Sequence, residues 1–413
     1  MTHAKTYLTD KPELGPLVSP HGNQAVPIHN WYSYKHGFSR ALVAYLIRHC
    51  DLRKGQWVLD PFCGGGTTLL ACKEVGINAQ GYDILPFSVF LSNVKLADYD
   101  PAKIRSTLDA FQSANHKILT VTELPEIPLV RKAFTPEVRT TLLALKARIE
   151  GIDDLKVRSL FRLAFLSIVE SVSNTTKAGG FLRIVKREID PSSIEYLLVD
   201  KLNSMLKDVV ETGTIRNGSN GGAFAGIGDA RSLPTNRVFD AVISSPPYPN
   251  RHDYTRIYEL EMVFDFVTSN EELKKVRYET IRSHVEARKK YDASGYESLP
   301  IVGELVKEIR RNGTNNPQVL GMLEGYFEDM YLALLEIGRC LKNKGKAALV
   351  VSNVRFAGVT VPVDEILAEL GQQAGLKIEN IFVLRYRGNS SQQMRNYKRN
   401  PSRESVIVWQ KDA

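Results

Sequence analysis

Short, mostly apolar runs recur along the chain and predict the strands of a buried sheet. Three of them end in an acid or a serine, at 57–60, 79–83 and 239–244, and three more lie at 346–351, 378–386 and 405–409. Runs of this length without helical periodicity are typical of strands covered on both faces. A glycine-rich turn and a helical stretch at 69–75 separate the first two runs. This order of strand, turn, helix and strand predicts an α/β fold with a doubly wound parallel sheet.

Helical spacing of apolar positions predicts the elements between these strands. It begins after Ser39, a candidate N-cap, and this first helix should stop near 51–55. The same spacing dominates 87–210 and returns at 254–266, where Asp253 is a candidate N-cap. An amphipathic helix at 327–341 should end at Lys344 and Gly345.

The patterns divide the chain into a sheet domain and its additions. Residues 1–28 have no period and predict an irregular N-terminal arm, and 29–100 and 223–413 together form the sheet domain. Residues 101–222 predict a helical insertion that ends in a Gly/Asn/Ser-rich loop at 217–222. Residues 269–318 are charged and predict a second insertion within the sheet domain.

Composition excludes several classes of protein. With 43% apolar and 24% charged residues in 413, the chain is not a disordered protein, a collagen-like fibre or a coiled-coil rod. Its formal charge of +8 is compatible with a polyanionic partner but does not require one. The four cysteines have no spacing typical of a disulfide scaffold or a zinc site, and no run predicts a signal peptide or a membrane span. We therefore expect a cytoplasmic protein.

The glycine-rich turn predicts a nucleotide site. Gly64, Gly65 and Gly66 let backbone N–H groups approach a ligand, and Asp83 at the end of the next strand can bind ribose hydroxyls. The turn is not the dinucleotide pattern and lacks the lysine of a phosphate loop, so an adenosine ligand without a pyrophosphate fits better. A tight turn without a ligand remains the alternative.

Ser245-Pro246-Pro247-Tyr248 follows the strand at 239–244. Two prolines cannot continue a central strand, so they force a rigid exit at the sheet edge where α/β folds place ligands. There the Ser245 side chain and a proline carbonyl can accept hydrogen bonds from one amino group, and Tyr248 offers a flat face for a planar ring. A proline turn with a buried tyrosine is the alternative.

Together these segments resemble the amino-methyltransferases of DNA. In that family a D-P-F-x-G-x-G-T motif binds S-adenosylmethionine and a (D/N/S)-P-P-(Y/F/W) motif holds the target amine; serine in its first position is similar to the cytosine-N4 branch. The resemblance implies a Rossmann-like S-adenosylmethionine-dependent methyltransferase sheet with a helical insertion, and Ser245, Pro246, Pro247 and Tyr248 as catalytic residues. Residues 30–39 resemble the motif that closes over the cofactor, and 228–231 resemble the turn that contacts its adenine. The implied cofactor-binding residues are Tyr34, Phe38, Ser39, Asp60, Pro61, Phe62, Gly64, Gly66, Thr67, Thr68, Asp83, Ile84, Asp229 and Ala230.

The reaction that the resemblance implies is a direct methyl transfer to the N4 amine of cytosine in double-stranded DNA. The base would be flipped out of the duplex and stacked on Tyr248. Methylation at carbon-5 of cytosine would need a cysteine nucleophile, and Cys63, inside the cofactor turn, is interpreted as a packing residue. No metal is expected, since His21, His29 and His36 lie in the irregular arm without a carboxylate pattern and are interpreted as surface or capping residues.

One basic run is the main candidate for DNA contact. The segment 385–403 carries six basic residues and no acid. Two arginines follow the catalytic motif directly, and the helical insertion at 101–222 is a candidate DNA-recognition region. The expected DNA-binding residues are Arg251, Arg256, Arg385, Arg387, Arg395, Lys398 and Arg399. The sequence thus favours the modification half of a restriction-modification pair, with a restriction endonuclease acting on the same site as its partner.

Three enzymatic alternatives remain open at this point, beside a non-catalytic DNA-binding protein with a relict cofactor fold, which the intact motifs at both sites disfavour. An adenine-N6 methyltransferase differs by little more than the first catalytic position, and an RNA base-amine methyltransferase would use the same chemistry. A nicotinamide-dependent dehydrogenase would also use a glycine turn and a strand-end acid, but it leaves Ser245-Pro246-Pro247-Tyr248 unexplained.

If the basic run follows phosphates, replacing Arg395, Lys398 and Arg399 together by glutamine should flatten the salt dependence of DNA binding. DNA releases a bound counterion for each phosphate that the protein neutralises, so the affinity falls as the salt concentration rises. With fewer phosphate contacts, fewer counterions are released and the affinity depends less steeply on salt. Titrations of a DNA duplex at several salt concentrations measure this slope, and an unchanged slope would place the DNA surface elsewhere.

Overall fold

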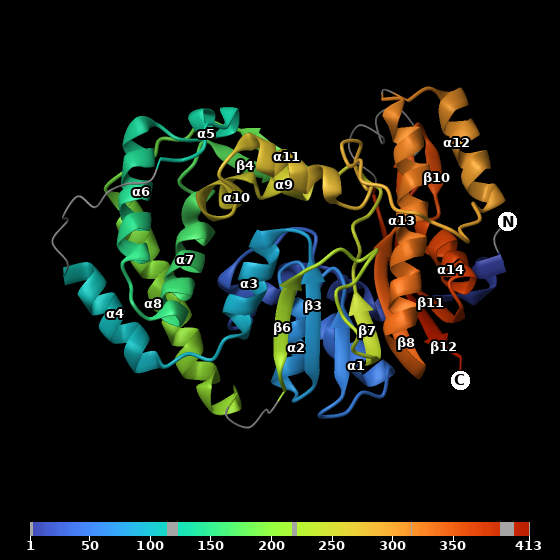
Figure 1. Cartoon of the computed structure of the whole chain (residues 1–413), viewed down its shortest axis with the longest axis horizontal. Helices are drawn as coiled ribbons and strands as arrows, with labels where there is room; N and C mark the ends of the chain where they lie inside the picture. The colour runs from blue at the N-terminus through green and yellow to red at the C-terminus, as the bar shows by residue number, and fades with distance from the viewer. Residues whose placement is uncertain (1–2, 114–122, 217–220, 315, 389–399, 413) are drawn as a thin grey trace.

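The computed structural model describes residues 3–113, 123–216, 221–314, 316–388 and 400–412. Within these residues one eight-stranded sheet forms the centre of the molecule (Figure 1). The strand order across it is β1 (Leu8–Asp10), β11 (Leu376–Arg387), β12 (Ser402–Lys411), β8 (Leu341–Ser352), β7 (Phe239–Ser244), β2 (Trp57–Asp60), β3 (Asn78–Asp83) and β6 (Ala223–Ile227). All neighbours are parallel except β12, which is antiparallel to both β11 and β8.

Helices cover both faces of this sheet. On β8, Ala348 and Val350 join one buried apolar cluster, whereas Ala347, Leu349 and Val351 join the other. This alternation follows from the two-residue period of a strand. The first cluster includes α1 (Arg40–His49), α2 (Thr67–Glu74) and α3 (Pro86–Leu96), and the second includes α13 (Gln318–Cys340) and α14 (Val363–Gln373). The doubly wound α/β fold expected from the sequence is therefore confirmed.

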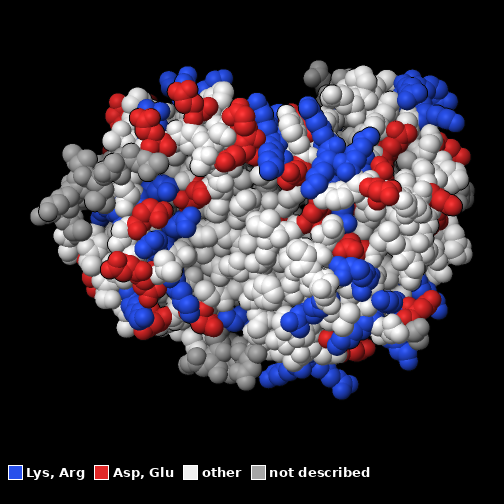
Figure 2. All heavy atoms as spheres, in the orientation of Figure 1, with Lys and Arg blue, Asp and Glu red and all other residues white. Residues whose placement is uncertain are grey.

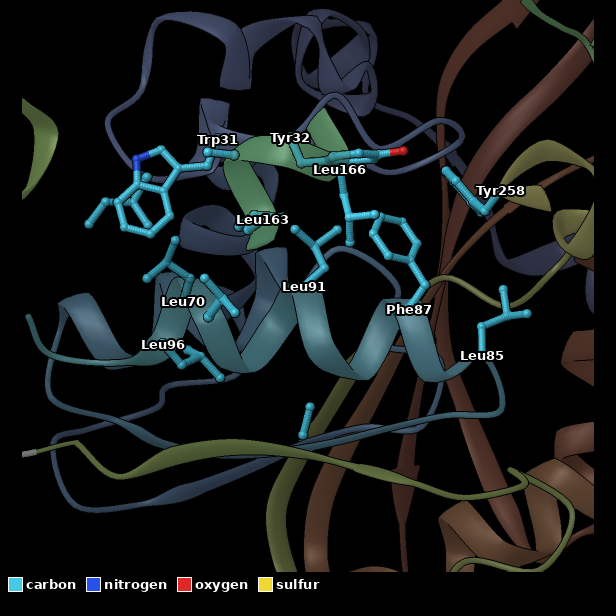
Figure 3. Packing of buried hydrophobic residues seen from close by; sticks show 14 of the residues in the cluster. Trp31, Tyr32, Leu70, Leu85, Phe87, Leu91, Leu96, Leu163, Leu166 and Tyr258 are labelled. Carbon is cyan, nitrogen blue, oxygen red and sulfur yellow. The ribbon is translucent and has the colours of Figure 1, made fainter. Parts of the chain in front are cut away.

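The insertion between β3 and β6 forms a lobe beside the sheet (Figure 1). It contains α4 (Pro101–Ser113), α5 (Pro128–Ala133), α6 (Pro136–Glu150), α7 (Leu155–Val169), a hairpin of β4 (Thr175–Ala178) and β5 (Phe181–Ile184), and α8 (Ser193–Arg216). Figure 3 shows Phe87 and Leu91 of α3 facing Leu163 and Leu166 of α7. The lobe therefore shares its apolar core with one face of the sheet.

A second group of short elements lies between β7 and β8. It consists of α9 (Tyr254–Ile257), α10 (Glu259–Asp265), α11 (Asn270–Glu279) and α12 (Pro300–Asn312). A small pair of strands, β9 (Val354–Phe356) and β10 (Val359–Val361), follows β8. In Figure 1, α9, α10 and α11 lie beyond the carboxyl ends of the central strands, close to β4.

The local signals read from the sequence are confirmed at the helix starts. The Ser39 hydroxyl accepts a hydrogen bond from the Leu42 N–H at 3.1 Å and caps α1. The Asp253 carboxylate accepts the Thr255 N–H at 2.9 Å and caps α9. Each predicted strand is present, although β8 and β11 extend beyond the predicted ranges.

Other expectations were wrong because long-range contacts decided the structure. The arm at 1–28 is not wholly irregular, since Leu8–Asp10 form an edge strand that pairs with β11. The 101–222 insertion is not all helical, because it contains the β4–β5 hairpin. The helix expected at 254–266 is divided into α9 and α10 at Tyr258. No helix of the described residues is long and apolar enough to cross a membrane.

Candidate functional site

A cavity of about 470 Å³ lies at the carboxyl ends of the parallel strands. Asp60, Asp83 and Ser245, which end or directly follow β2, β3 and β7, all line it. Because parallel strands end at one edge, residues far apart in sequence meet there. The walls are formed by parts of 18–24, 29–38, 60–68, 83–85, 228–230, 245–248 and 280–284, together with Lys95, Tyr254, Val350, Arg385, Arg387 and Glu404.

The glycine turn is shaped by close contact with an aromatic ring. Gly64 and Gly66 have φ of 46° and 75°, which glycine adopts without strain. A Cβ at Gly65 would lie 2.9 Å from the Cβ of Tyr34, so a side chain there would displace Tyr34. Tyr34 in turn stacks on Tyr258, with ring centroids 4.7 Å apart. The turn therefore requires small residues to bring its backbone against the wall that Tyr34 forms.

Asp60 joins the glycine turn to the end of β7, directly before the predicted catalytic segment 245–248. Its buried carboxylate accepts the Ser244 hydroxyl at 2.5 Å and the Phe62 N–H at 3.2 Å. Burial raises the pKa of Asp60 to about 6, although the hydrogen bond from Ser244 opposes the shift. This carboxylate thus fixes the end of β7 against the start of the turn.

Asp83 lies at the end of β3 and fixes the other side of the turn. Its Oδ2 accepts the Gly64 N–H and its Oδ1 accepts the Leu85 N–H, both at 2.9 Å. Burial raises the pKa of Asp83 to about 6, although these backbone hydrogen bonds favour the charged form. A carboxylate has further lone pairs, so Asp83 can still accept ligand hydroxyls on the cavity wall.

Charged and polar side chains hold Asp229 in the turn at 228–231. Arg231 Nη2 lies 2.7 Å from Asp229 Oδ2, and the Tyr291 hydroxyl donates to the same oxygen at 2.9 Å. Burial alone would raise the pKa of Asp229, but the hydrogen bonds and charge of Arg231 outweigh it and the pKa is lowered. Arg231 also pairs with Asp329 of α13 at 2.9 Å. The Asp229 turn is therefore anchored on the α13 face of the sheet.

Ser245 presents a hydrogen-bond acceptor to the cavity. Its hydroxyl donates to the Val350 carbonyl of β8 at 3.0 Å, and the Tyr248 hydroxyl lies 3.2 Å from Ser245 Oγ. Because the Ser245 proton is committed to a carbonyl, its remaining lone pair is available to an incoming N–H donor. The Pro246 carbonyl accepts no hydrogen bond within the described parts of the chain. Two acceptors therefore stand at neighbouring residues.

Most of the residues expected to bind a cofactor lie together. Twelve of the fourteen line the cavity, and the exceptions are Ser39 and Gly66. Ser39 donates its hydroxyl to the Leu17 carbonyl at 2.6 Å while it caps α1. Gly66 is turned toward Ser92, whose Oγ would lie 2.8 Å from a Cβ at that position. These two residues shape the elements around the cavity and are not part of its wall.

Several arginines expected to bind DNA have acidic partners. Arg385 and Arg387 line the cavity and both pair with Glu404, Arg387 at 2.6 Å. Arg256 pairs with Asp253 at 3.3 Å and with Glu286. Arg251 is exposed and has no ion pair within the described residues. Arg395, Lys398 and Arg399 lie outside the described residues.

The basic run at 385–403 therefore offers fewer unpaired cations to DNA phosphates than its composition suggests. Arg403, a sixth member of the run, lies 3.0 Å from Asp364 and also pairs with Glu365 at 2.5 Å. Both carboxylates belong to α14, so Arg403 holds that helix on β12. The acids that neutralise these arginines lie outside the run or just after it, and the sequence did not show that they would meet it.

The surface interpretation of His29 was wrong, whereas Cys63 is buried as its interpretation as a packing residue predicts. His29 is buried, not a surface residue, and its Nε2 lies 3.3 Å from Glu74 Oε1; burial lowers the pKa of His29 although Glu74 opposes the shift. Cys63 is buried against Gly81, and burial raises the pKa of its thiol, with Asp83 adding to the shift. Among the described residues, no group of three or more His, Cys, Asp or Glu side chains is arranged to hold a metal ion.

Sequence reasoning missed Val350 and Glu404. Val350 contributes its backbone carbonyl, which accepts the Ser245 hydroxyl. Any residue would supply a carbonyl there, so the sequence carries no signal for this contact. Glu404 follows the basic run immediately, and its position on β12 opposite Arg385 could have been found from the antiparallel register of two adjacent strands.

The chain is similar to known DNA methylases. A family model described as DNA methylase matches residues 16–92. The chain is 32% identical to the Type II methyltransferase M.BsoBI of Geobacillus stearothermophilus, over 96% of this chain and 88% of that protein. It is 30% identical to the Type II methyltransferase M.AvaI of Nostoc sp. strain PCC 7120, over 96% of this chain and 89% of that protein.

Solved structures also give matches at low identity. The rRNA methyltransferase aviRa from Streptomyces viridochromogenes is 10% identical with a TM-score of 0.31, over 96% of this chain and 89% of that chain. TrmN from Thermus thermophilus is 11% identical with a TM-score of 0.31, over 90% of this chain and 48% of that chain.

The raised pKa of Asp83 predicts that cofactor binding depends on pH. Above pH 6 the carboxylate is charged and accepts hydroxyl donors, and below pH 6 it is protonated and loses acceptor capacity. We expect the affinity for S-adenosylhomocysteine, a stable analogue of the methyl donor, to fall roughly ten-fold between pH 7.5 and pH 5. Isothermal titration calorimetry measures this change.

Two variants separate Asp83 from the other acids of the site. Asp83→Asn should bind the analogue weakly with a flat pH profile, whereas Asp229→Asn should keep the wild-type profile because the pKa of Asp229 is lowered. A wild-type profile in Asp83→Asn would assign the titration to another group, such as Asp60.

Proposed function

This chain belongs to the DNA methylase family that includes the Type II methyltransferases, and on this basis we propose that it methylates the exocyclic N4 amine of cytosine in double-stranded DNA. S-adenosylmethionine is the methyl donor. When bound in the cavity, it would supply an electrophilic methyl group carried on a sulfonium. The chain would act as the modification half of a restriction-modification pair, with a restriction endonuclease that cuts the same site as its partner.

The observation that carries this proposal is the hydrogen bond from Ser245 to the Val350 carbonyl. It leaves Ser245 Oγ as an acceptor on the cavity wall, and together with the carbonyl of the next residue, Pro246, it would hold the two protons of one amine. An amine held in this way has its lone pair turned out of conjugation with the ring and directed at the methyl donor. Transfer would exchange the C–S bond of the donor for the new N–C bond, with S-adenosylhomocysteine as the leaving group. The methylated amine would then be cationic and would release one of its two held protons to solvent.

The remaining residues of the site are suited to direct transfer. In this proposal Asp83 holds the ribose, and Gly64 and Gly65 bring the backbone of the turn against the cofactor; all three line the cavity. Asp229 also lines the cavity, and the resemblance assigns its turn to the adenine, although Arg231 and Tyr291 already occupy the carboxylate itself. Tyr248 offers a face on which a flipped base can stack. Cys63 is buried against Gly81 inside the cofactor turn, and burial raises the pKa of its thiol; both agree with a packing role and a mechanism without a covalent intermediate.

A second candidate is adenine-N6 methylation, because the two reactions share the same acceptor chemistry. Ser245 in the first catalytic position favours cytosine by resemblance, since Asp or Asn is more usual there in adenine enzymes. An RNA base amine would also fit two acceptors and a stacking ring, but the relatives over most of the chain are Type II methyltransferases. A nicotinamide-dependent dehydrogenase no longer fits a member of this family.

Incubation of the protein with labelled S-adenosylmethionine and unmethylated genomic DNA, followed by nucleoside digestion and mass spectrometry, tests the proposal. We expect N4-methylcytosine. N6-methyladenine would support the second candidate, and transfer to RNA alone or to neither nucleic acid would contradict both. Sequencing of the product then maps the methylated site.

Tyr248→Ala should lose most of the turnover, by roughly a hundred-fold, while it keeps its affinity for S-adenosylhomocysteine, because base stacking is worth about 1–3 kcal/mol. Tyr248→Phe retains the ring and should keep most of the activity, which separates stacking from the hydroxyl contact with Ser245. Single-turnover methylation and calorimetry measure the two quantities. An unchanged rate in Tyr248→Ala would remove this residue from the assigned site.

A further inference from the structure

We propose that the β4–β5 hairpin is a wedge that enters the DNA beside the target base, and that Phe181 at its tip fills the space that the flipped base leaves. This inference rests on the proposed function, because it requires a base to leave the duplex. The hairpin belongs to the 101–222 insertion, and no catalytic or cofactor motif of the chain includes it.

The hairpin is rigidly held at its inner face. Lys177 of β4 lies 2.6 Å from Glu261 of α10, and both side chains are almost fully buried, with exposed fractions of 4% and 1%. The Lys177 ammonium also donates to the Tyr32 hydroxyl at 2.6 Å. Opposite Lys177 in the ladder, Leu182 is buried as well. A buried charge pair is costly to break, so the base of the hairpin has one fixed position.

The tip of the hairpin rests against the two segments that border the cavity. A Cβ on Gly180 would lie 2.8 Å from the His252 ring, four residues after Tyr248. The Gly179 carbonyl lies 3.4 Å from Nε2 of His36, which lines the cavity. The two histidine rings are 4.4 Å apart and form one surface under the turn. The hairpin therefore ends at the cavity entrance.

Phe181 points away from this support. Side chains alternate between the faces of a strand, so Phe181 and Arg183 share the face opposite the buried Leu182. The Phe181 side chain is 52% exposed, although an aromatic ring of this size is usually covered. A rigid element thus holds an uncovered phenyl ring beside the catalytic segment.

Four cations lie close in sequence to the tip or to the two histidines that support it. Arg183 and Lys186 follow Phe181, and Lys35 and Arg251 flank the two histidines; none of the four has an acidic partner within the described parts of the chain. Burial lowers the pKa of His252 to about 4, and the charges of His36, Arg251 and Arg387 add to this shift. Figure 2 shows Lys and Arg side chains near α9 and α11 with Asp and Glu beside them, while the surface over α3 and β6 is largely uncharged.

This combination fits DNA more closely than a protein partner. Cations without partners neutralise phosphates, and an apolar ring inserted between bases offsets part of the stacking lost when a base is flipped. An exposed ring beside the entrance would have no such role if the substrate were a free nucleotide, which has no stack to open.

The test compares Phe181→Ala with wild type on two synthetic duplexes that carry the mapped methylation site. In the first duplex the target base is normally paired, and in the second it faces an abasic position, so flipping is easier. We expect kcat/KM of Phe181→Ala to fall roughly ten- to a hundred-fold on the paired duplex. On the duplex with the abasic position, we expect the loss to shrink to below about three-fold, since less stacking must be broken.

Two matched variants separate a wedge from a structural effect. Phe181→Leu retains an apolar group and should recover most of the activity on the paired duplex. Ile184→Ala removes a second exposed apolar side chain, 48% exposed on the same strand, but on the opposite face, and should change neither rate. Fluorescence of 2-aminopurine placed next to the target should rise less with Phe181→Ala than with wild type.

Equal losses on both duplexes, or no loss on the paired one, would overturn the wedge. An equal effect of Ile184→Ala would overturn it too, because it would assign the defect to hairpin stability. These outcomes differ from failure of the proposed function, in which the wild-type protein itself would methylate neither duplex.

Discussion

The buried carboxylate of Asp60 is the contact on which the arrangement of the site depends. It ends β2, accepts the Phe62 N–H at the start of the glycine turn, and accepts the Ser244 hydroxyl directly before the catalytic segment. A donor site and an acceptor site for a methyl group must lie at a fixed separation for in-line transfer. One side chain sets that separation here, and the desolvation of the carboxylate, visible in its raised pKa, is the cost of placing it between the two loops.

Around this contact, the protein uses charge mainly to fix its own elements near the cavity. Arg231 ties the Asp229 turn to α13, Arg403 ties β12 to α14, and Glu404 binds two arginines at the cavity wall. A net charge counted from composition therefore overstates what reaches a polyanion. Arg251 and Arg183 have no acidic partner among the described residues, and under the proposed function they are the cations expected to meet DNA.

The sequence predicted the parts of the fold whose causes are local. The six strand runs, the caps at Ser39 and Asp253 and the glycine turn depend on neighbouring residues, and all appear in the structure. The arm strand at Leu8–Asp10 and the β4–β5 hairpin were missed because three or four residues give too short a pattern, and pairing with distant partners decides them. For the site, the resemblance predicted motif residues that the structure brings to one cavity. The Val350 carbonyl is placed by the pairing of β8 with β7, and Glu404 by the pairing of β12 with β11, so both depend on which strands become neighbours.

The root of the hairpin also bears on how the molecule assembles. Lys177 contacts Glu261 and Tyr32, which are 84 and 145 residues away in the sequence. Contacts of such high sequence separation form late, because the loops that they close must lose their entropy first. The sheet joins segments at least as far apart, such as β1 and β11, so sequence separation does not place the hairpin root after the sheet. The root needs the segment around Tyr32, the insertion lobe and α10 together, and the cavity entrance is complete only once all three have been synthesised and docked.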